Sequence, residues 1–164
     1  MGRRSSAALL EPAGPMTLLI LALCLALTGC RVNPEAQSGG DGYRNEAQPL
    51  VLDSWVTDDL NAGGGDTTDW KAIEITTPAQ MVVEIRADES DTELLVGAFD
   101  RYGVQLGKVE RRESTPIASF AFAASAVGKH FIMVRATGGP PSSYTLRVRT
   151  GDAIEGAGGL RPDF

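Results

Sequence analysis

Apolar and polar residues alternate in short stretches after residue 50, and a period of two residues is the pattern of a strand with one buried face. In the clearest stretch, Met81, Val83 and Ile85 alternate with polar or charged neighbours, apart from Val82. The same pattern predicts strands, in chain order, over 51–58, 70–76, 80–87, 93–100, 104–110, 129–136 and 143–150.

Glycine and proline residues separate these segments and indicate the fold class. Gly-Gly-Gly-Asp at 63–66 and Gly-Gly-Pro-Pro at 138–141 are turn sequences. The segment 117–127 contains five alanines and is ambiguous between a strand and a helical turn. Short strands with turns every roughly 8–12 residues are typical of sandwiches. The sequence therefore predicts an all-β fold over 50–150, an antiparallel, jelly-roll-like β-sandwich of about eight strands, followed by a flexible tail over 151–164.

The start of the chain has a different pattern, a continuous apolar run of twelve residues over 16–27. Arg3 and Arg4 precede this run, which is short for a membrane-spanning helix, so it is typical of a secretory signal. The run closes on Leu27-Thr28-Gly29-Cys30, which resembles the lipobox of bacterial lipoproteins. The alternative is a buried cysteine at the end of a hydrophobic helix.

The lipobox resemblance implies that a diacylglyceryl group alkylates the thiol of Cys30, a step that needs a nucleophilic thiolate. The chain is then cut before Cys30, and the new amine is acylated, for example with palmitate. On this interpretation residues 1–29 are a lipoprotein signal peptide. Arg31 stands where, by resemblance to enteric bacteria, an aspartate would favour the inner membrane, so the outer membrane is the predicted location, on either of its faces.

The residues that follow Cys30 are mostly polar and rich in glycine. Such a composition buries too little apolar surface to order a chain, so the sequence predicts a lipidated cysteine and flexible linker over 30–49. Fully extended, a linker of this length would reach about 60 Å. The folded domain would then stand clear of the lipid headgroups.

Charge and cysteine content exclude some classes of partner and of cross-link. The formal net charge is −6, and removal of residues 1–29 leaves 13 basic and 20 acidic residues, a charge of −7. An acidic chain is a poor candidate for nucleic-acid binding, because contacts to phosphate dominate that affinity. Cys24 lies in the signal peptide, so Cys30 is the single thiol of the mature chain and no disulfide within the chain is expected.

Several short motifs occur in the order Asp66-Thr-Thr-Asp69-Trp70, Phe99-Asp100-x-x-Gly103, Gly128-x-x-Phe131-x-x-Val134 and Tyr144-Thr-Leu146. Taken in this order, they resemble the bacterial pre-peptidase C-terminal domain over about residues 50–150. The resemblance implies a β-sandwich of the kind attached to secreted peptidases and other exported proteins. Lys71 stands where that family has an inward aromatic residue, and His130 where it often has tyrosine. Both departures lead us to expect looser core packing.

The sequence gives no support to catalysis, and we predict no catalytic residues. His130 is the only histidine, and its place on the apolar side of a strand favours a hydrogen-bonded core residue over a base or a ligand. No second histidine or free thiol is present in the mature chain, and no Gly-x-Ser-x-Gly motif offers a serine nucleophile. Paired carboxylates are plentiful, but they would need a cleft that a domain of this size seldom provides.

Two acidic loops are candidates for calcium binding, because Ca²⁺ takes six or more oxygen ligands. The resemblance to bacterial collagenase domains, some of which bind calcium in this way, makes calcium a candidate cofactor, and no other cofactor is expected. The candidate ligands are Asp66 and Asp69 in one loop and Asp88 and Asp91 in the other. Their spacing does not match an EF-hand, and the alternative interpretation is that these acidic turns are simply solvated.

Trp55 and Trp70 are candidate ligand-facing aromatic residues, which with Tyr102 and Phe131 would form a platform for stacking sugars. The alternative is that they pack in the core or at its edge. The main functional hypothesis is a membrane-anchored, non-catalytic binding or scaffold module, an accessory subunit of a cell-envelope assembly with a protein partner. The runner-up is a carbohydrate- or calcium-dependent surface-binding module.

Overall fold

The computed structural model describes residues 33–151, and these form nine strands and two short 3-10 helices. The predicted signal peptide, Cys30 and the tail beyond Gly151 lie outside the described residues. No helix within 33–151 has the length and apolar character needed to cross a membrane. In chain order the elements are η1 Arg44–Glu46, β1 Gln48–Pro49, β2 Val56–Leu60, η2 Ala62–Gly64, β3 Thr68–Ile75, β4 Ala79–Ala87, β5 Glu93–Phe99, β6 Gln105–Arg111, β7 Ala118–Ala124, β8 Gly128–Gly138 and β9 Ser142–Thr150.

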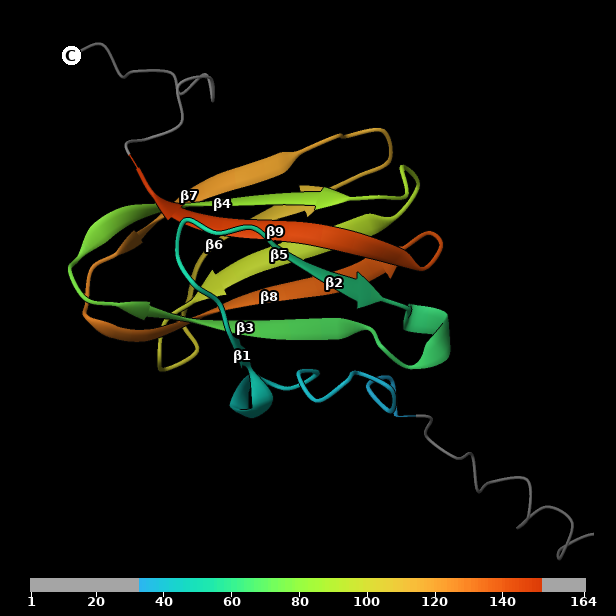
Figure 1. Cartoon of the computed structure of the whole chain (residues 1–164), viewed down its shortest axis with the longest axis horizontal. Coiled ribbons are helices and arrows are strands. Elements are labelled where there is room, and N and C mark those ends of the chain that lie inside the picture. The colour runs from blue at the N-terminus through green and yellow to red at the C-terminus, as the bar shows by residue number, and fades with distance from the viewer. Residues whose placement is uncertain (1–32, 152–164) are drawn as a thin grey trace, which may run out of the picture. The chain divides into compact units, whose positions relative to one another are not determined.

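The strands form two sheets that pack face to face (Figure 1). The five-stranded sheet has the order β1-β3-β8-β5-β6, and the four-stranded sheet has the order β2-β9-β4-β7. All neighbouring strands are antiparallel except β1, which pairs with β3 in parallel. This arrangement confirms the predicted all-β, antiparallel sandwich.

The core lies between the sheets and is built by alternate residues of the longer strands. In β4, Met81, Val83 and Ile85 are fully buried, whereas Glu84 and Arg86 lie on the outer face. Facing them from the five-stranded sheet are the buried apolar residues Ile73, Ile75, Leu94, Val96, Ala98, Ile132 and Val134. The hydrophobic alternation in the sequence is therefore the pattern that places each strand in its layer.

One predicted strand begins later than the sequence indicated, and the segment that the sequence left ambiguous is assigned by the structure. The strand predicted over 51–58 is β2, which begins only at Val56, because Asp53 adopts a left-handed φ of 64° and its amide donates to the carbonyl of Val148. The ambiguous segment is the strand β7, not a helical turn. Phe120 and Phe122 both point into the core, which only a two-residue period allows.

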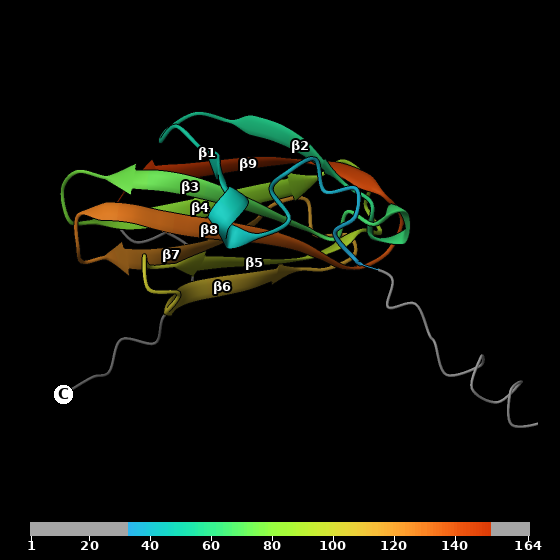
Figure 2. The ribbon, with the colours of Figure 1, turned by 90° about the horizontal axis from the view of Figure 1, so that it is seen from below.

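Residues 33–49, here called the N-terminal strap, are docked on the domain, so the prediction of a flexible linker over 30–49 is wrong for these residues. The amide of Gln37 donates to the carbonyl of Gly65 at 2.7 Å, and the amide of Trp70 donates to that of Asp41 at 2.8 Å. Further along the strap, β1 pairs with β3. Figure 2 looks onto this side of the domain, with the strap in blue and cyan. The polar composition that indicated disorder instead supplies partners for the backbone at this edge.

Candidate functional site

A buried lysine ties the strap to both sheets. Lys71 lies on the inward side of β3 and is 4% exposed. Its Nζ donates a hydrogen bond to Asp41 of the strap at 2.5 Å and a second one to Asp58 of β2. Burial by itself lowers the pKa of Lys71, but the hydrogen bonds to the two carboxylates outweigh it and hold the pKa above its usual value. The lysine is therefore charged and paired.

Asp69 lies two residues before Lys71 on the same side of β3 and is also buried. Burial raises its pKa to about 8, against the hydrogen bond that the Tyr144 hydroxyl donates to its Oδ2 at 2.7 Å; the charge of Asp41 raises it further. Burial, together with Asp69, also raises the pKa of Tyr144. At neutral pH the Asp69 carboxyl is therefore largely protonated, while Lys71 keeps its charge.

Calcium does not fit this cluster. Within 33–151, Asp41, Asp58 and Asp69 are the only three potential metal ligands whose oxygens lie within 4.8 Å of one another. Two of them already accept hydrogen bonds from the Lys71 ammonium, and burial raises the pKa of the third, Asp69, to about 8, which favours its neutral form. A divalent cation would have to displace a bonded ammonium and still find further oxygens. The cluster is a buried ion pair with a neutral carboxyl beside it.

Asp66 lies beside this cluster. Burial raises its pKa to about 6, and the charges of Asp41 and Glu35 add to the effect. Its Oδ1 is buried and accepts no hydrogen bond from any described residue. Asp66 is therefore another carboxyl at this end of β3 that is stabilised in its protonated form.

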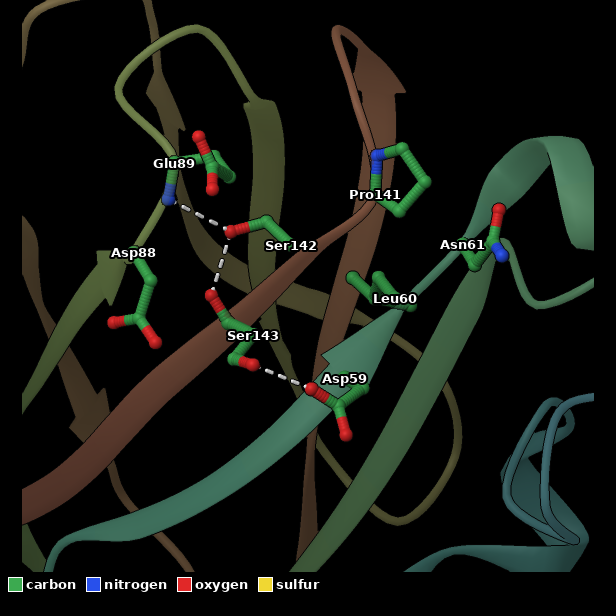
Figure 3. Close-up of a pocket in the computed structure, with 8 residues that line it drawn as sticks. All are labelled: Asp59, Leu60, Asn61, Asp88, Glu89, Pro141, Ser142 and Ser143. Carbon is green, nitrogen blue, oxygen red and sulfur yellow. Dashed lines mark hydrogen bonds between the residues drawn. The ribbon is translucent and has the colours of Figure 1, made fainter.

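The two acidic loops meet at a hollow of about 440 Å³ (Figure 3). Asp59 lies near the end of β2, just before the first loop, and Asp88 and Glu89 come from the second loop. The Ser143 hydroxyl donates to Asp59 at 2.5 Å, and the Ser142 hydroxyl accepts from the Glu89 amide at 3.0 Å. The three carboxylates line an open hollow without converging on one point, because they are not among the groups close enough to share an ion.

The four candidate calcium ligands are thus not brought together. Asp69 belongs to the buried cluster and Asp66 lies beside it, whereas Asp88 lines the hollow. Asp91 lies in the loop after β4, where its Oδ1 accepts from the hydroxyl of Ser90 at 2.7 Å. Sequence spacing alone could not show that Asp69 lies on β3 of the five-stranded sheet, whereas Asp88 follows β4 of the four-stranded sheet.

The two tryptophans lie on the outer faces of different sheets, so they do not form one platform. Trp55 precedes β2, and the residue is 43% exposed. The guanidinium carbon of Arg147 lies 4.5 Å from the Trp55 ring centroid, and that of Arg86 lies 5.4 Å from it. Trp70 is half-buried on β3, with its ring centroid 5.3 Å from that of Phe99. Trp55 is therefore exposed and held in place by two arginines, whereas Trp70 packs against Phe99.

Arg147 is fixed on its other side by Glu84, which lies opposite it on β4. Its Nε donates to Glu84 Oε2 at 2.7 Å, and Arg149 Nε lies 3.6 Å from the other carboxylate oxygen. We call Trp55, Glu84, Arg86 and Arg147 the Trp55 face. It places an indole on a paired and ordered arginine, and cation–π contact of this kind stabilises the ring orientation by about 0.5–1 kcal/mol at exposed sites.

His130 is a core residue, as the sequence indicated. It is 3% exposed, and its Nδ1 lies 3.1 Å from the carbonyl oxygen of Gly128. Sequence reasoning missed Asp41, which it placed in a flexible linker, and it did not foresee that Lys71 would be paired. An inward lysine in an alternating strand was the available signal, since a buried charge requires a partner.

No protein-family model and no curated protein sequence matches the chain. Solved structures do: the two packed sheets define a β-sandwich, and this fold is similar to that of the pre-peptidase C-terminal domain of a collagenase from Bacillus anthracis. The TM-score is 0.51 at 15% sequence identity, over 62% of this chain and 93% of that one. This likeness agrees with the fold that the sequence motifs implied.

Two further matches have lower TM-scores. A surface-associated copper-binding protein of Methylomicrobium album matches at 9% identity over 64% of this chain and 98% of that one, with a TM-score of 0.47. A carbohydrate-binding module of a Cellvibrio mixtus lichenase matches at 12% identity over 71% of this chain and 95% of that one, with a TM-score of 0.41.

The first prediction concerns the buried pair. Substituting Asp41→Ala removes one of the two carboxylates that compensate Lys71, so we expect it to lower the free energy of unfolding by about 3 kcal/mol, the lower end for a broken buried pair. Urea denaturation measures the loss, and hydrogen exchange should show lost protection in the strap. The matched control is Asp88→Ala at an exposed acid, which should change stability by no more than about 0.5 kcal/mol. Equal effects of the two substitutions would contradict the ion-pair interpretation.

The second prediction concerns pH. Because the native state raises the pKa of Asp69 to about 8, it binds this proton more tightly than the unfolded chain does. The free energy of unfolding should therefore fall as pH rises from about 4 to about 8. Asp69→Asn keeps an acceptor for Tyr144 but removes the titration. Melting temperatures at pH 5, 7 and 9 should fall less steeply for this variant than for the wild type, whereas Asp88→Asn should keep the wild-type slope. Parallel profiles for wild type and Asp69→Asn would show that Asp69 is not the titrating group.

Proposed function

We propose that the protein is a membrane-anchored, non-catalytic binding module that acts as an accessory subunit of a cell-envelope assembly. The observation that carries this proposal is the exposed Trp55, held by Arg86 and Arg147 on the outer face of the four-stranded sheet. Tryptophan and arginine are the residue types that contribute most binding energy at protein–protein interfaces. A surface that presents both in a fixed arrangement suits recognition of a protein partner.

The buried groups support a binding role over catalysis. His130 is enclosed in the core, and the hydrogen-bonded Asp69–Tyr144 pair is 1% exposed at both residues. A general base must reach a proton of its substrate, and neither arrangement is open to one. The chemistry of these groups is used to hold the domain together.

The anchor rests on the sequence. The apolar run ending at Leu27-Thr28-Gly29-Cys30 supports processing to a lipidated Cys30, and the envelope is then the place where the module meets its partner. Several acyl chains together hold a protein at a membrane far more firmly than a single one.

The third prediction tests this function in two measurements on protein from a bacterial host that processes lipoproteins. The intact mass should correspond to a chain that begins at an acylated Cys30. A photoreactive residue at Thr57, which is exposed on β2 beside the Trp55 face, should cross-link to a defined envelope protein. Adding Trp55→Ala should reduce that adduct at least tenfold, because truncation of a central aromatic anchor removes about 2 kcal/mol or more.

The matched control places the same photoreactive residue at Glu74, which is exposed on the outer side of the other sheet. It should not capture the same partner in a Trp55-dependent way. An unacylated chain that begins at Met1 would remove the anchor from the proposal. Adducts at Thr57 that survive Trp55→Ala would remove the binding face.

A second candidate function, recognition of a carbohydrate, is favoured by the same exposed indole, since pyranose rings stack on tryptophan and the neighbouring Glu84 and Arg86 can bond hydroxyl groups.

The fourth prediction is that, if this is the function, sedimentation with isolated cell-wall glycan depends on Trp55. Trp55→Ala should abolish it, whereas Trp70→Phe, on the other sheet, should not. Repeating the assay with calcium and with a chelator tests the calcium-dependent form. Glycan binding unaffected by Trp55→Ala would contradict a sugar site at this face.

A further inference from the structure

The docked strap sets how far the folded domain can stand from its anchor. Its first described residue, Asn33, is three residues after Cys30. Three residues span at most about 11 Å, against about 60 Å for the whole of 31–49 as a free extended linker. We propose that the strap holds the domain directly against the lipid surface, with one defined end of the sandwich facing the headgroups. This inference rests on the lipidated Cys30 of the proposed function.

The strap is bonded from its first turn, so the short reach is a property of the folded state. The Glu35 carboxylate accepts hydrogen bonds from the amides of Thr67 and Thr68, both at 3.0 Å. The Thr67 hydroxyl donates to the carbonyl of Pro34, also at 3.0 Å. Further along, Asp41 is 2% exposed and paired with Lys71. Releasing the strap would therefore leave a buried ammonium with one fewer partner, which is costly.

The same contacts define the end of the domain that faces the lipid. Gln37 bonds to Gly65, which directly follows η2, so 33–37 lie beside the loop 61–65. Figure 1 shows this region where the blue start of the described chain lies below the green loop after β2. We call 33–37 and 61–65 together the proximal end. The partner of this surface is the polar headgroup layer of the membrane.

The proximal end itself carries little charge, although Asn61 lies beside the hollow that is lined by Asp59, Asp88 and Glu89. Among its ten residues Glu35 alone is charged, and its carboxylate is bonded to the backbone amides of Thr67 and Thr68 at the start of β3. Beside it, Tyr43 is 47% exposed and its hydroxyl donates to Asn33 Oδ1 at 3.1 Å. Tyrosine is enriched at membrane interfaces, where an aromatic ring meets a polar layer.

The distance of the Trp55 face from the proximal end limits which proteins the face can reach. Trp55 precedes β2, and five residues of strand separate it from the proximal end, a rise of about 17 Å. The Trp55 face would therefore work within a few nanometres of the membrane. A membrane protein, or the membrane-proximal part of an envelope complex, lies in that layer.

The fifth prediction uses acylated, full-length protein in phosphatidylcholine vesicles that contain a lipid with a nitroxide on its headgroup. Because Cys30 is the single mature cysteine and is acylated on this proposal, a fluorophore can be attached at Gly63→Cys in the proximal end, where an added Cβ would meet only Asn61 Oδ1, at an ordinary contact distance of 3.8 Å. The control label is Val127→Cys, next to Gly128, which pairs with Ile75 at the opposite end of β3. The nitroxide should quench the label at residue 63 at least threefold more than the label at residue 127.

Two insertions distinguish the effect of the short tether before the strap from a general effect of lengthening the chain. Twenty Gly/Ser residues placed after Arg31 lengthen the tether and should abolish the difference between the labels. The same insertion after Glu113, in the exposed loop between β6 and β7, should preserve it. Equal quenching at both positions in protein whose mass proves acylation would overturn the inference while leaving the proposed function intact. Absence of acylation would overturn both.

Discussion

The hydrogen bonds of the Lys71 ammonium to Asp41 and Asp58 are the contacts on which the arrangement of the domain depends. They join three parts of the chain that backbone pairing does not join in this way: the N-terminal strap, β2 of one sheet and β3 of the other. A buried ammonium without partners would cost far more than a domain of this size can spare, since net stabilities are only about 5–15 kcal/mol. Lys71 therefore requires the strap to be docked, and the docked strap covers the edge of β3.

The same cluster explains why the acidic character of this region is not a sign of metal binding. Carboxylates gathered in a low-dielectric site need either a cation or protons. Here the lysine supplies the cation, and protonation of Asp69 removes a further negative charge. An inward lysine thus changes the chemistry of the sandwich interior, with one counter-ion from β2 and a second, Asp41, from the strap outside the sheets. Lys71 is nevertheless only 4% exposed, and its charge is matched by two carboxylates.

Much of the fold could be predicted because one side of each strand is buried and the period of two is visible in the sequence. Met81, Val83 and Ile85 show the inward side of β4 directly, and the later strands follow the same rule. The segment with Phe120 and Phe122 could not be decided locally, since alanine favours a helix and only the opposite sheet makes the strand favourable.

The site was less predictable, because it depends on contacts between distant residues. Asp41 lies 30 positions before Lys71, in a stretch whose composition is that of a disordered linker. Nothing local distinguishes this aspartate from its neighbours. The separation of Trp55 from Trp70 likewise follows from the assignment of strands to two sheets. By contrast, the core position of His130 could be read from its strand, because alternation fixes which side a residue faces.

If the domain is anchored and binds its partner as proposed, the docked strap also changes the thermodynamics of recognition at the Trp55 face. A module on a long, free linker explores many orientations, and binding must remove that freedom. A domain held at its proximal end has already lost most of it, and confinement to the membrane raises the effective concentration of a partner in the same layer. The indole itself is held by two arginines, so little side-chain entropy is lost on contact. On the proposed anchoring and binding, the buried lysine would therefore contribute to recognition from a distance, because the strap that it fixes would decide which partners the exposed tryptophan can reach.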